Sequence, residues 1–177
     1  GRVRALQASR ALSRELDERK RAEEGLRLAA TVYQNSSEAM MVTDTENRII
    51  AVNSAFVRTT GYSADEVIGK NPHVLYSGRH DRGYYQQMWQ TLNSTGHWQG
   101  EIWNRRKNGE IYAEMLTINT IYNQDGSVHQ RVALFSDITE KKKADEKIWQ
   151  QANYDPLTNL PNRRMFHDRL EQEIKKS

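Results

Sequence analysis

Residues 97–122, with the sequence HWQGEIWNRRKNGEIYAEMLTINTIY, decide how this chain folds. Side chains in the first part of this stretch alternate between two faces, as in a strand that is covered on one side. Asn108-Gly109 is the strongest short-range signal for a β-hairpin, so residues 110–122 are predicted to form the returning strand. Asp125-Gly126 marks a second hairpin turn, and residues 128–136 complete a three-stranded meander.

The segment before the meander contains two more strand candidates, residues 40–43 and 47–52. The turn-forming residues 44–47 lie between them, which favours a hairpin. Short helices are expected after three capping residues, because each side chain can accept a hydrogen bond from a free backbone N–H of a first helical turn. These caps are Asn53, Ser63 and Asp81. Five antiparallel strands with short helices on one face make an α+β fold.

Long helices are expected at both ends of this unit. Residues 5–33 contain no Pro and only one interior Gly. A 4-3-4-3 spacing runs through them, which is the pattern of a coiled-coil seam. The seam consists of Ala5, Ser9, Leu12, Leu16, Arg19, Glu23, Leu26, Ala30 and Tyr33. Two charged members weaken it, so a parallel dimeric coiled coil and a solvated single helix both remain open. Thr139 is predicted to cap a second helix over residues 140–152.

Composition excludes several classes of protein. The 177 residues include no Cys, which rules out disulfides, thiolate metal sites and cysteine nucleophiles. The net charge of +3 comes from the flanks, because residues 37–137 contain 9 basic and 11 acidic groups. A nucleic-acid-binding body would be basic, so we expect no nucleic-acid partner. The uninterrupted apolar runs are too short for a transmembrane span.

The stretch from Tyr33 to Thr139 resembles a PAS sensor domain. The motifs occur in the family's order: Thr43-Asp44, Ile50-x-Val52-Asn53, Phe56, Thr60-Gly61-Tyr62, Glu66-x-x-Gly69-x-Asn71-Pro72, Trp98-x-Gly100-Glu101, residues 104–110 and Asp137-Ile138-Thr139. The resemblance implies a five-stranded antiparallel sheet with short helices on one face, flanked by signalling helices. It divides the chain into a coiled-coil-like helix at residues 1–32, the PAS domain at 33–139, a linker helix at 140–153 and a further segment at 154–177.

Residues 154–164 resemble the opening of a GGDEF domain, whose entry signature is Asp-x-Leu-Thr-x-Leu-Pro-Asn-Arg. The resemblance implies that a longer parent protein makes cyclic-di-GMP, or degrades it through an EAL domain. The Gly-Gly-Asp/Glu-Glu-Phe string is absent from this chain, so no catalytic or metal-binding residue is expected in it. GTP or cyclic-di-GMP would bind only in the missing domains. Because those domains use GTP, we expect a cytoplasmic location, with the parent anchored in a bacterial inner membrane.

The function implied by both resemblances is that of a homodimeric sensory module that controls the output domain of its parent. Asp137 and Thr139 are expected to pass the signal from the sheet to the linker helix. Asp155 is expected to fix the start of the next domain. The alternative function is structural rather than sensory: a dimerisation scaffold whose pocket is empty.

The PAS resemblance implies a pocket between the sheet and the short helices, and several cofactors are candidates for it. The candidate lining residues are Asn71, Trp89, Trp98, Asn104 and Glu114, by similarity to FAD-binding PAS sensors of nitrogen-fixation regulators. In that reading Asn104 bonds the isoalloxazine edge, whereas a carboxylate at Glu114 would match only a ligand N–H. The chain therefore offers FAD as one candidate, an unknown metabolite as another, and an empty pocket as a third.

Two other cofactor chemistries are disfavoured. Light-driven adduct formation needs a cysteine where this chain has Pro72. Such light-sensing domains also carry a glutamine that switches its hydrogen bonds to the flavin. In this chain Phe135 lies near that position, and its side chain cannot form those bonds. Haem needs an axial histidine. His73 and His80 are the candidates, but a histidine in a charged loop is more often a surface residue. Trp89 itself, at helical spacing from Tyr85, could equally be a core residue.

Overall fold

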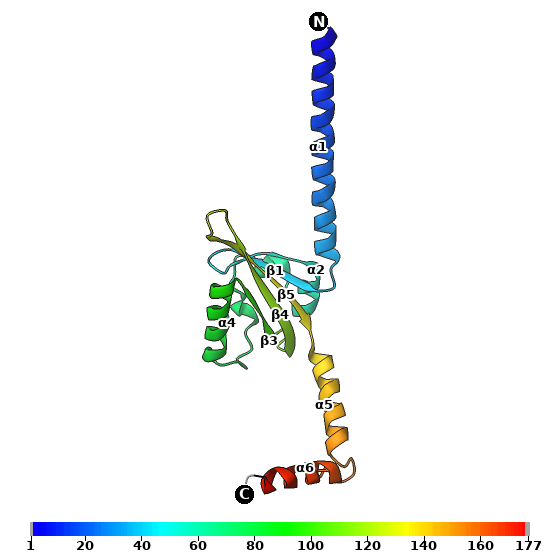
Figure 1. Cartoon of the computed structure of the whole chain (residues 1–177), viewed down its shortest axis with the longest axis vertical. Coiled ribbons are helices and arrows are strands. Elements are labelled where there is room, and N and C mark those ends of the chain that lie inside the picture. The colour runs from blue at the N-terminus through cyan, green and yellow to red at the C-terminus, as the bar shows by residue number, and fades with distance from the viewer. Residues whose placement is uncertain (1, 176–177) are drawn as a thin grey trace.

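The computed structural model describes residues 2–175 and places one folded body between projecting helices (Figure 1). Helix α1 (Arg2–Asn35) extends from one side of the body. Helix α5 (Thr139–Asn153) leaves on the opposite side, and α6 (Arg163–Ile174) turns across its end. Across the part of the chain so described, no helix combines the length and apolar character needed to cross a membrane.

The body is built on one antiparallel sheet, which confirms the predicted α+β class and PAS-type fold. Its strands are β1 (Ala39–Thr43), β2 (Ile49–Val52), β3 (His97–Arg105), β4 (Ile111–Tyr122) and β5 (Val128–Asp137). Their order in the sheet is β2-β1-β5-β4-β3. The last strand therefore lies in the middle, where it joins the N-terminal hairpin to the C-terminal meander.

Short helices cover one face of the sheet. They are α2 (Ser54–Thr60), α3 (Ala64–Val67), the 3₁₀ helix η1 (Pro72–Leu75) and α4 (Arg82–Thr95). Asn53 and Asp81 cap α2 and α4 as expected, and Ser63 forms its capping box with Glu66. Asn53 does more than cap, because its buried amide also bonds the Tyr33 and Glu38 carbonyls. It thereby fastens the end of α1 to the body.

The core lies between the sheet and these helices. Phe56 of α2 and Phe135 of β5 are buried and meet edge to face, with ring centroids 5.9 Å apart. Such edge-to-face pairs contribute about 0.5–1.5 kcal/mol beyond the area they bury. This packing holds the central strand β5 against α2.

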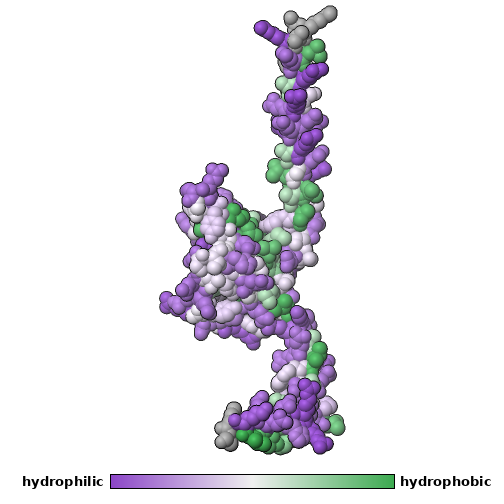
Figure 2. Space-filling view, viewed as in Figure 1, coloured by the Kyte–Doolittle hydropathy of each residue, from purple (hydrophilic) through white to green (hydrophobic). Residues whose placement is uncertain are grey.

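Among the described residues, helix α1 contacts the body only near its C-terminal end. Leu12, Leu16 and Leu26 of the predicted seam are between 49% and 73% exposed. Figure 2 shows isolated apolar patches along an otherwise hydrophilic projecting helix. The seam is therefore available for contact, and the dimeric coiled coil stays a prediction.

The prediction that Thr139 caps the linker helix through its side chain is wrong. Thr139 is itself the first helical residue, and Ile138 occupies the cap position without a side-chain hydrogen bond. The Thr139 hydroxyl instead accepts a 3.0 Å bond from the backbone N–H of Ala113 in β4. The reason is that the Ile138 N–H already bonds the Ala113 carbonyl, which brings the start of α5 against the interior strand β4.

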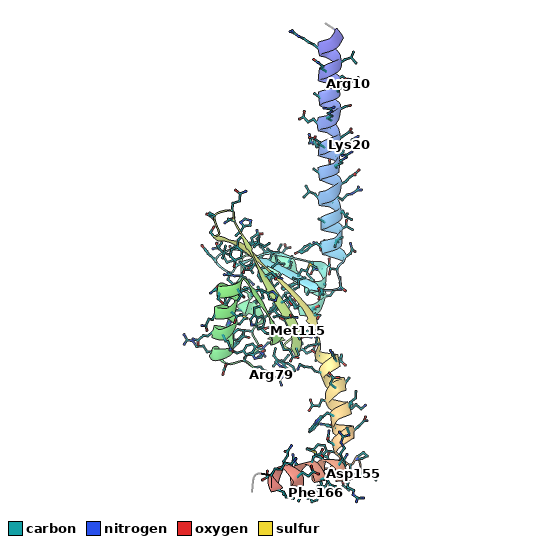
Figure 3. All side chains as sticks on the ribbon, viewed as in Figure 1. Arg10, Lys20, Arg79, Met115, Asp155 and Phe166 are labelled. Atoms are coloured by element: carbon teal, nitrogen blue, oxygen red, sulfur yellow. The ribbon has the colours of Figure 1, made fainter. Side chains whose placement is uncertain are left out.

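The segment between α5 and α6 is a tight turn organised by Asp155, which Figure 3 labels at this corner. One Asp155 carboxylate oxygen accepts bonds from the backbone N–H groups of Leu157 and Thr158. Asn162 then caps α6 by accepting from Met165 N–H. The role of Asp155 in fixing the start of a following domain stays a prediction.

Candidate functional site

A cavity of about 160 Å³ lies between the pocket face of the sheet and the helices η1 and α4. Most of its wall is apolar, from Met41, Leu75, Met88, Ile102, Leu116, Ile118, Ala133 and Phe135. Polar side chains line it at separate places, Asn104 with Glu114 at one and Thr43 with Arg131 at another. A mainly apolar wall with a few placed polar groups is typical of small-molecule sites.

Asn104 and Glu114 form the polar group at the closed end. They stand on β3 and β4, and the Asn104 Nδ2 donates a 2.9 Å hydrogen bond to Glu114 Oε1. Glu114 is 1% exposed, and its other oxygen, Oε2, has no hydrogen-bond partner among the residues described. A buried polar atom without a partner costs about 1–3 kcal/mol. A ligand that bonds Oε2 would remove that cost.

Among the residues described, no cation forms an ion pair with Glu114. Arg106, whose charge does influence Glu114, stacks over the Tyr112 ring at 4.2 Å and forms ion pairs with Glu110 and Asp137. The Tyr112 hydroxyl lies on the same face of β4 and, against the raising effect of burial, has a lowering influence on the pKa of the Glu114 carboxyl group. The two groups nevertheless lie outside hydrogen-bond geometry, and the hydroxyl has no other hydrogen-bond partner within residues 2–175. The carboxyl group therefore sits in an apolar environment with one neutral amide bonded to it.

Burial raises the pKa of Glu114 to about 8, against the lowering influence of Tyr112 and Asn104. The side chain is consequently protonated at pH 7. A neutral carboxylic acid carries an O–H donor as well as an acceptor oxygen, like an amide. An ionised Glu114 would match only a ligand N–H, as expected above, whereas in the neutral form the Asn104–Glu114 pair can match a ligand edge that has both N–H and C=O groups.

Four of the five predicted pocket residues line the cavity: Asn71, Trp89, Asn104 and Glu114. Trp98 does not. It lies on the same face of β3, but its ring packs edge-on against Tyr84 and over Gly100, where an added Cβ would stand 2.6 Å from the indole. The Asn71 side chain is engaged in capping η1 through His73 N–H. Whether these residues hold a ligand stays a prediction.

The two histidines are placed differently. His73 lines the cavity and stacks on Tyr76, with ring centroids 4.6 Å apart. His80 lies outside the cavity wall and stacks on Tyr84, and its Nε2 accepts a 3.1 Å bond from Trp103 N–H. Burial lowers the pKa of His80, which suits a neutral ring that acts as an acceptor.

Arg131 is a charged cavity residue that the sequence analysis did not predict. It stands on β5, and it is the sole Arg or Lys among the lining residues within the described chain. The signal that could have revealed it is strand parity, because Arg131, Ala133 and Phe135 alternate onto one face of β5. A charged residue in that row is unexpected on a face that packs against a core.

The start of α5 is connected to the closed end of the cavity. Asp137 accepts a hydrogen bond from Thr139 N–H at 2.9 Å and pairs with Arg106. Burial alone would raise the pKa of Asp137, but these bonds outweigh it and hold the pKa below its ordinary value. Thr139 in turn bonds Ala113, which lies between Tyr112 and Glu114 in β4. Pocket and helix therefore share one strand segment.

Comparison with known proteins identifies signalling relatives. Over 118 residues, or 67% of this chain, it is 33% identical to a nitrogen fixation regulatory protein of Klebsiella oxytoca, and it is 31% identical to a blue-light-activated histidine kinase of Brucella anthropi over 63% of the chain. The match spans about a quarter of the length of these relatives, 24% and 25%.

A solved structure agrees with the fold. The PAS domain of a Colwellia psychrerythraea protein superimposes with a TM-score of 0.61, covering 65% of this chain and 98% of that one at 24% identity. The family model described as PAS domain matches residues 37–140, which is more than half of the chain. The chain therefore belongs to the PAS domain family.

Proposed function

We propose that this chain is the sensory part of a homodimeric signalling protein, in which a change in the cavity is passed through α5 to a GGDEF-type output domain that handles cyclic-di-GMP. The observation that carries the proposal is the junction at Thr139, where the first residue of α5 bonds the strand that carries Glu114. The GGDEF-like residues 154–164 follow α5 directly, so a rotation of this helix would reorient whatever domain they begin.

An insertion experiment in the parent protein tests this mechanism. One residue added after Lys143 rotates everything downstream by about 100°. We expect a large change in the conversion of GTP to cyclic-di-GMP, or in its response to the sensed signal. Seven added residues are the matched control, because they restore the helical phase to within about 20°. Equal effects of the two insertions would contradict transmission through helix phase.

Homodimer formation is the second element of the proposal. The exposed leucines of the α1 seam and the half-buried apolar side chains on the outer face of the sheet would both be covered by a second copy. Light scattering of the 177-residue chain should give a dimer. The double variant Leu12→Glu and Leu16→Glu should shift it toward monomer with unchanged folding. A monomeric wild-type chain would contradict this element.

FAD is the cofactor candidate that the cavity chemistry favours. The Asn104–Glu114 pair, with Glu114 neutral, offers acceptor and donor to the ring edge, and Trp89 and Phe135 border the same space. When bound, an isoalloxazine would supply a redox centre. An absorption spectrum of the purified chain tests this assignment, because a flavin gives visible bands. A colourless protein that gains no flavin on incubation would favour another ligand or an empty scaffold.

A further inference from the structure

The end of the cavity away from Glu114 carries a cation without an anionic partner among the residues described. Arg131 lines the cavity, and no carboxylate of the described residues lies within ion-pair distance of its guanidinium. Its only hydrogen bond there is a long one, 3.3 Å, from Nη2 to the neutral side chain of Asn93. The guanidinium lies over the Trp89 ring at 5.2 Å, and its buried Nε has no partner in this part of the chain.

The neighbours of Arg131 complete a polar row across three strands. Thr43 of β1 and Thr120 of β4 are its direct partners in the sheet, so the three side chains share the pocket face. Thr43 also lines the cavity. The Thr120 hydroxyl is buried and, like Arg131 Nε, lacks a hydrogen-bond partner in the described structure. A buried hydroxyl beside a cation whose own Nε–H is unpartnered forms a suitable cradle for an oxyanion.

The polar row is well separated from the closed end. Glu114 and Thr120 are six residues apart on β4, which corresponds to about 20 Å along the strand. One cavity reaches both Glu114 and Arg131. A single ligand that satisfies both ends must be elongated, with a neutral edge of donor and acceptor groups at one end and a negative charge at the other.

We propose that Arg131, with Thr43 and Thr120, is the oxyanion-binding end of the pocket, so that the cavity selects ligands bearing a phosphate or carboxylate group distal to the edge held by Asn104 and Glu114. This inference rests on the ligand-sensing function proposed above. It specifies, for that function, that the ligand carries a negative charge and which end of the ligand carries it.

Two flavins test the complete ligand class. Riboflavin and FMN share the ring system and differ by one phosphate. The 177-residue chain should bind FMN about tenfold or more tightly than riboflavin, since a charge-assisted hydrogen bond is added. Arg131→Met should abolish that difference by weakening FMN binding much more than riboflavin binding, whereas Arg131→Lys should retain part of it. Arg58→Met, at an exposed position of α2, is the matched control and should preserve the preference.

A second measurement separates the anion site from the flavin assignment. Inorganic pyrophosphate and malonate, representing the two anion types, are added to the ligand-free chain and its melting temperature is recorded. A rise in the wild type that disappears in Arg131→Met supports the oxyanion site, even when neither flavin binds and the FAD assignment fails. The proposal is overturned if no anion stabilises the wild type and FMN is not preferred. It is also overturned if Arg131→Met weakens FMN and riboflavin equally, because that is the result of a purely structural role.

Discussion

Glu114→Gln should stabilise the folded chain, and the gain should grow with pH. The wild-type carboxyl is buried, bonded by Asn104 on one oxygen and unpartnered on the other among the residues described. Glutamine has nearly the same shape, can accept the same bond, and carries no charge at any pH. The substitution therefore removes a titration while leaving the packing in place.

The magnitude follows from the difference in pKa between the two states. The pKa of Glu114 is 4.5 when unfolded and about 8 when folded, because burial penalises the charged form. The folded state holds the proton more tightly, so this carboxyl lowers stability progressively as pH rises from 4.5 to 8. Each pH unit in that window removes about 1.4 kcal/mol. The loss is about 3 kcal/mol at pH 7 and about 4 kcal/mol at pH 8, and the glutamine variant avoids it.

Urea unfolding followed by tryptophan fluorescence, at four pH values between 5 and 8, measures this effect. The difference between variant and wild type matters, because contributions from the histidines and other titrating groups cancel in it. We expect a small difference at pH 5 that increases with pH. A difference that is constant across the range, or a variant that is destabilised at pH 8, would refute the argument that Glu114 is buried in its neutral form.

Three further substitutions test the framework around the cavity. Asn53→Ala should cost about 3 kcal/mol in denaturant unfolding, because it removes four hydrogen bonds of a buried side chain; a cost below about 1 kcal/mol would mean that α1 is not fastened through this residue. Gly96→Ala should cost more than Gly126→Ala, since both have positive φ but only the former would place a Cβ 2.6 Å from the Tyr122 hydroxyl; equal melting temperatures would contradict this contact. Thr139→Val should cost about 1–3 kcal/mol by leaving a buried N–H unpaired, whereas Thr139→Ser should be nearly neutral; a larger loss in Thr139→Ser than in Thr139→Val would mean that the methyl group, and not the hydroxyl, matters.

The meander could be predicted because its signals are local. Asn108-Gly109 and Asp125-Gly126 demand left-handed backbone at the glycine, and both glycines have it, with φ of 90° and 82°. The position of β5 between β1 and β4 depends on contacts that are distant in sequence, and turn chemistry alone does not specify it. The same distinction explains Thr139. Its type and position suit a helix cap, but its hydroxyl bonds the Ala113 N–H of β4, which lies 26 residues away in sequence and comes beside Thr139 only in the folded chain.

The cavity shows what a family resemblance can and cannot reveal about a site. The resemblance to FAD-binding PAS sensors pointed to Asn104 and Glu114, and the chemistry of an amide and a carboxyl group is compatible with recognition of a heterocycle edge. The protonation state of Glu114 could not be read from the sequence, since it depends on where Arg106 points. Arg106 lies eight residues before Glu114 and could have neutralised it, but Asp137 and Glu110 hold its guanidinium above Tyr112 instead.

Burial also dictates which end of the cavity can accept charge. An anion placed beside Glu114 would lose its hydration in an apolar environment and gain no cation in return, so its free energy there would be high. Arg131 is only partly buried and is already charged, so an anion at that end keeps some solvent and gains an ion pair. A ligand entering the pocket in the reverse direction would place its charge against the closed end. The arrangement of one neutral acid and one unpartnered arginine therefore fixes the direction in which an anionic ligand binds, before any shape is considered.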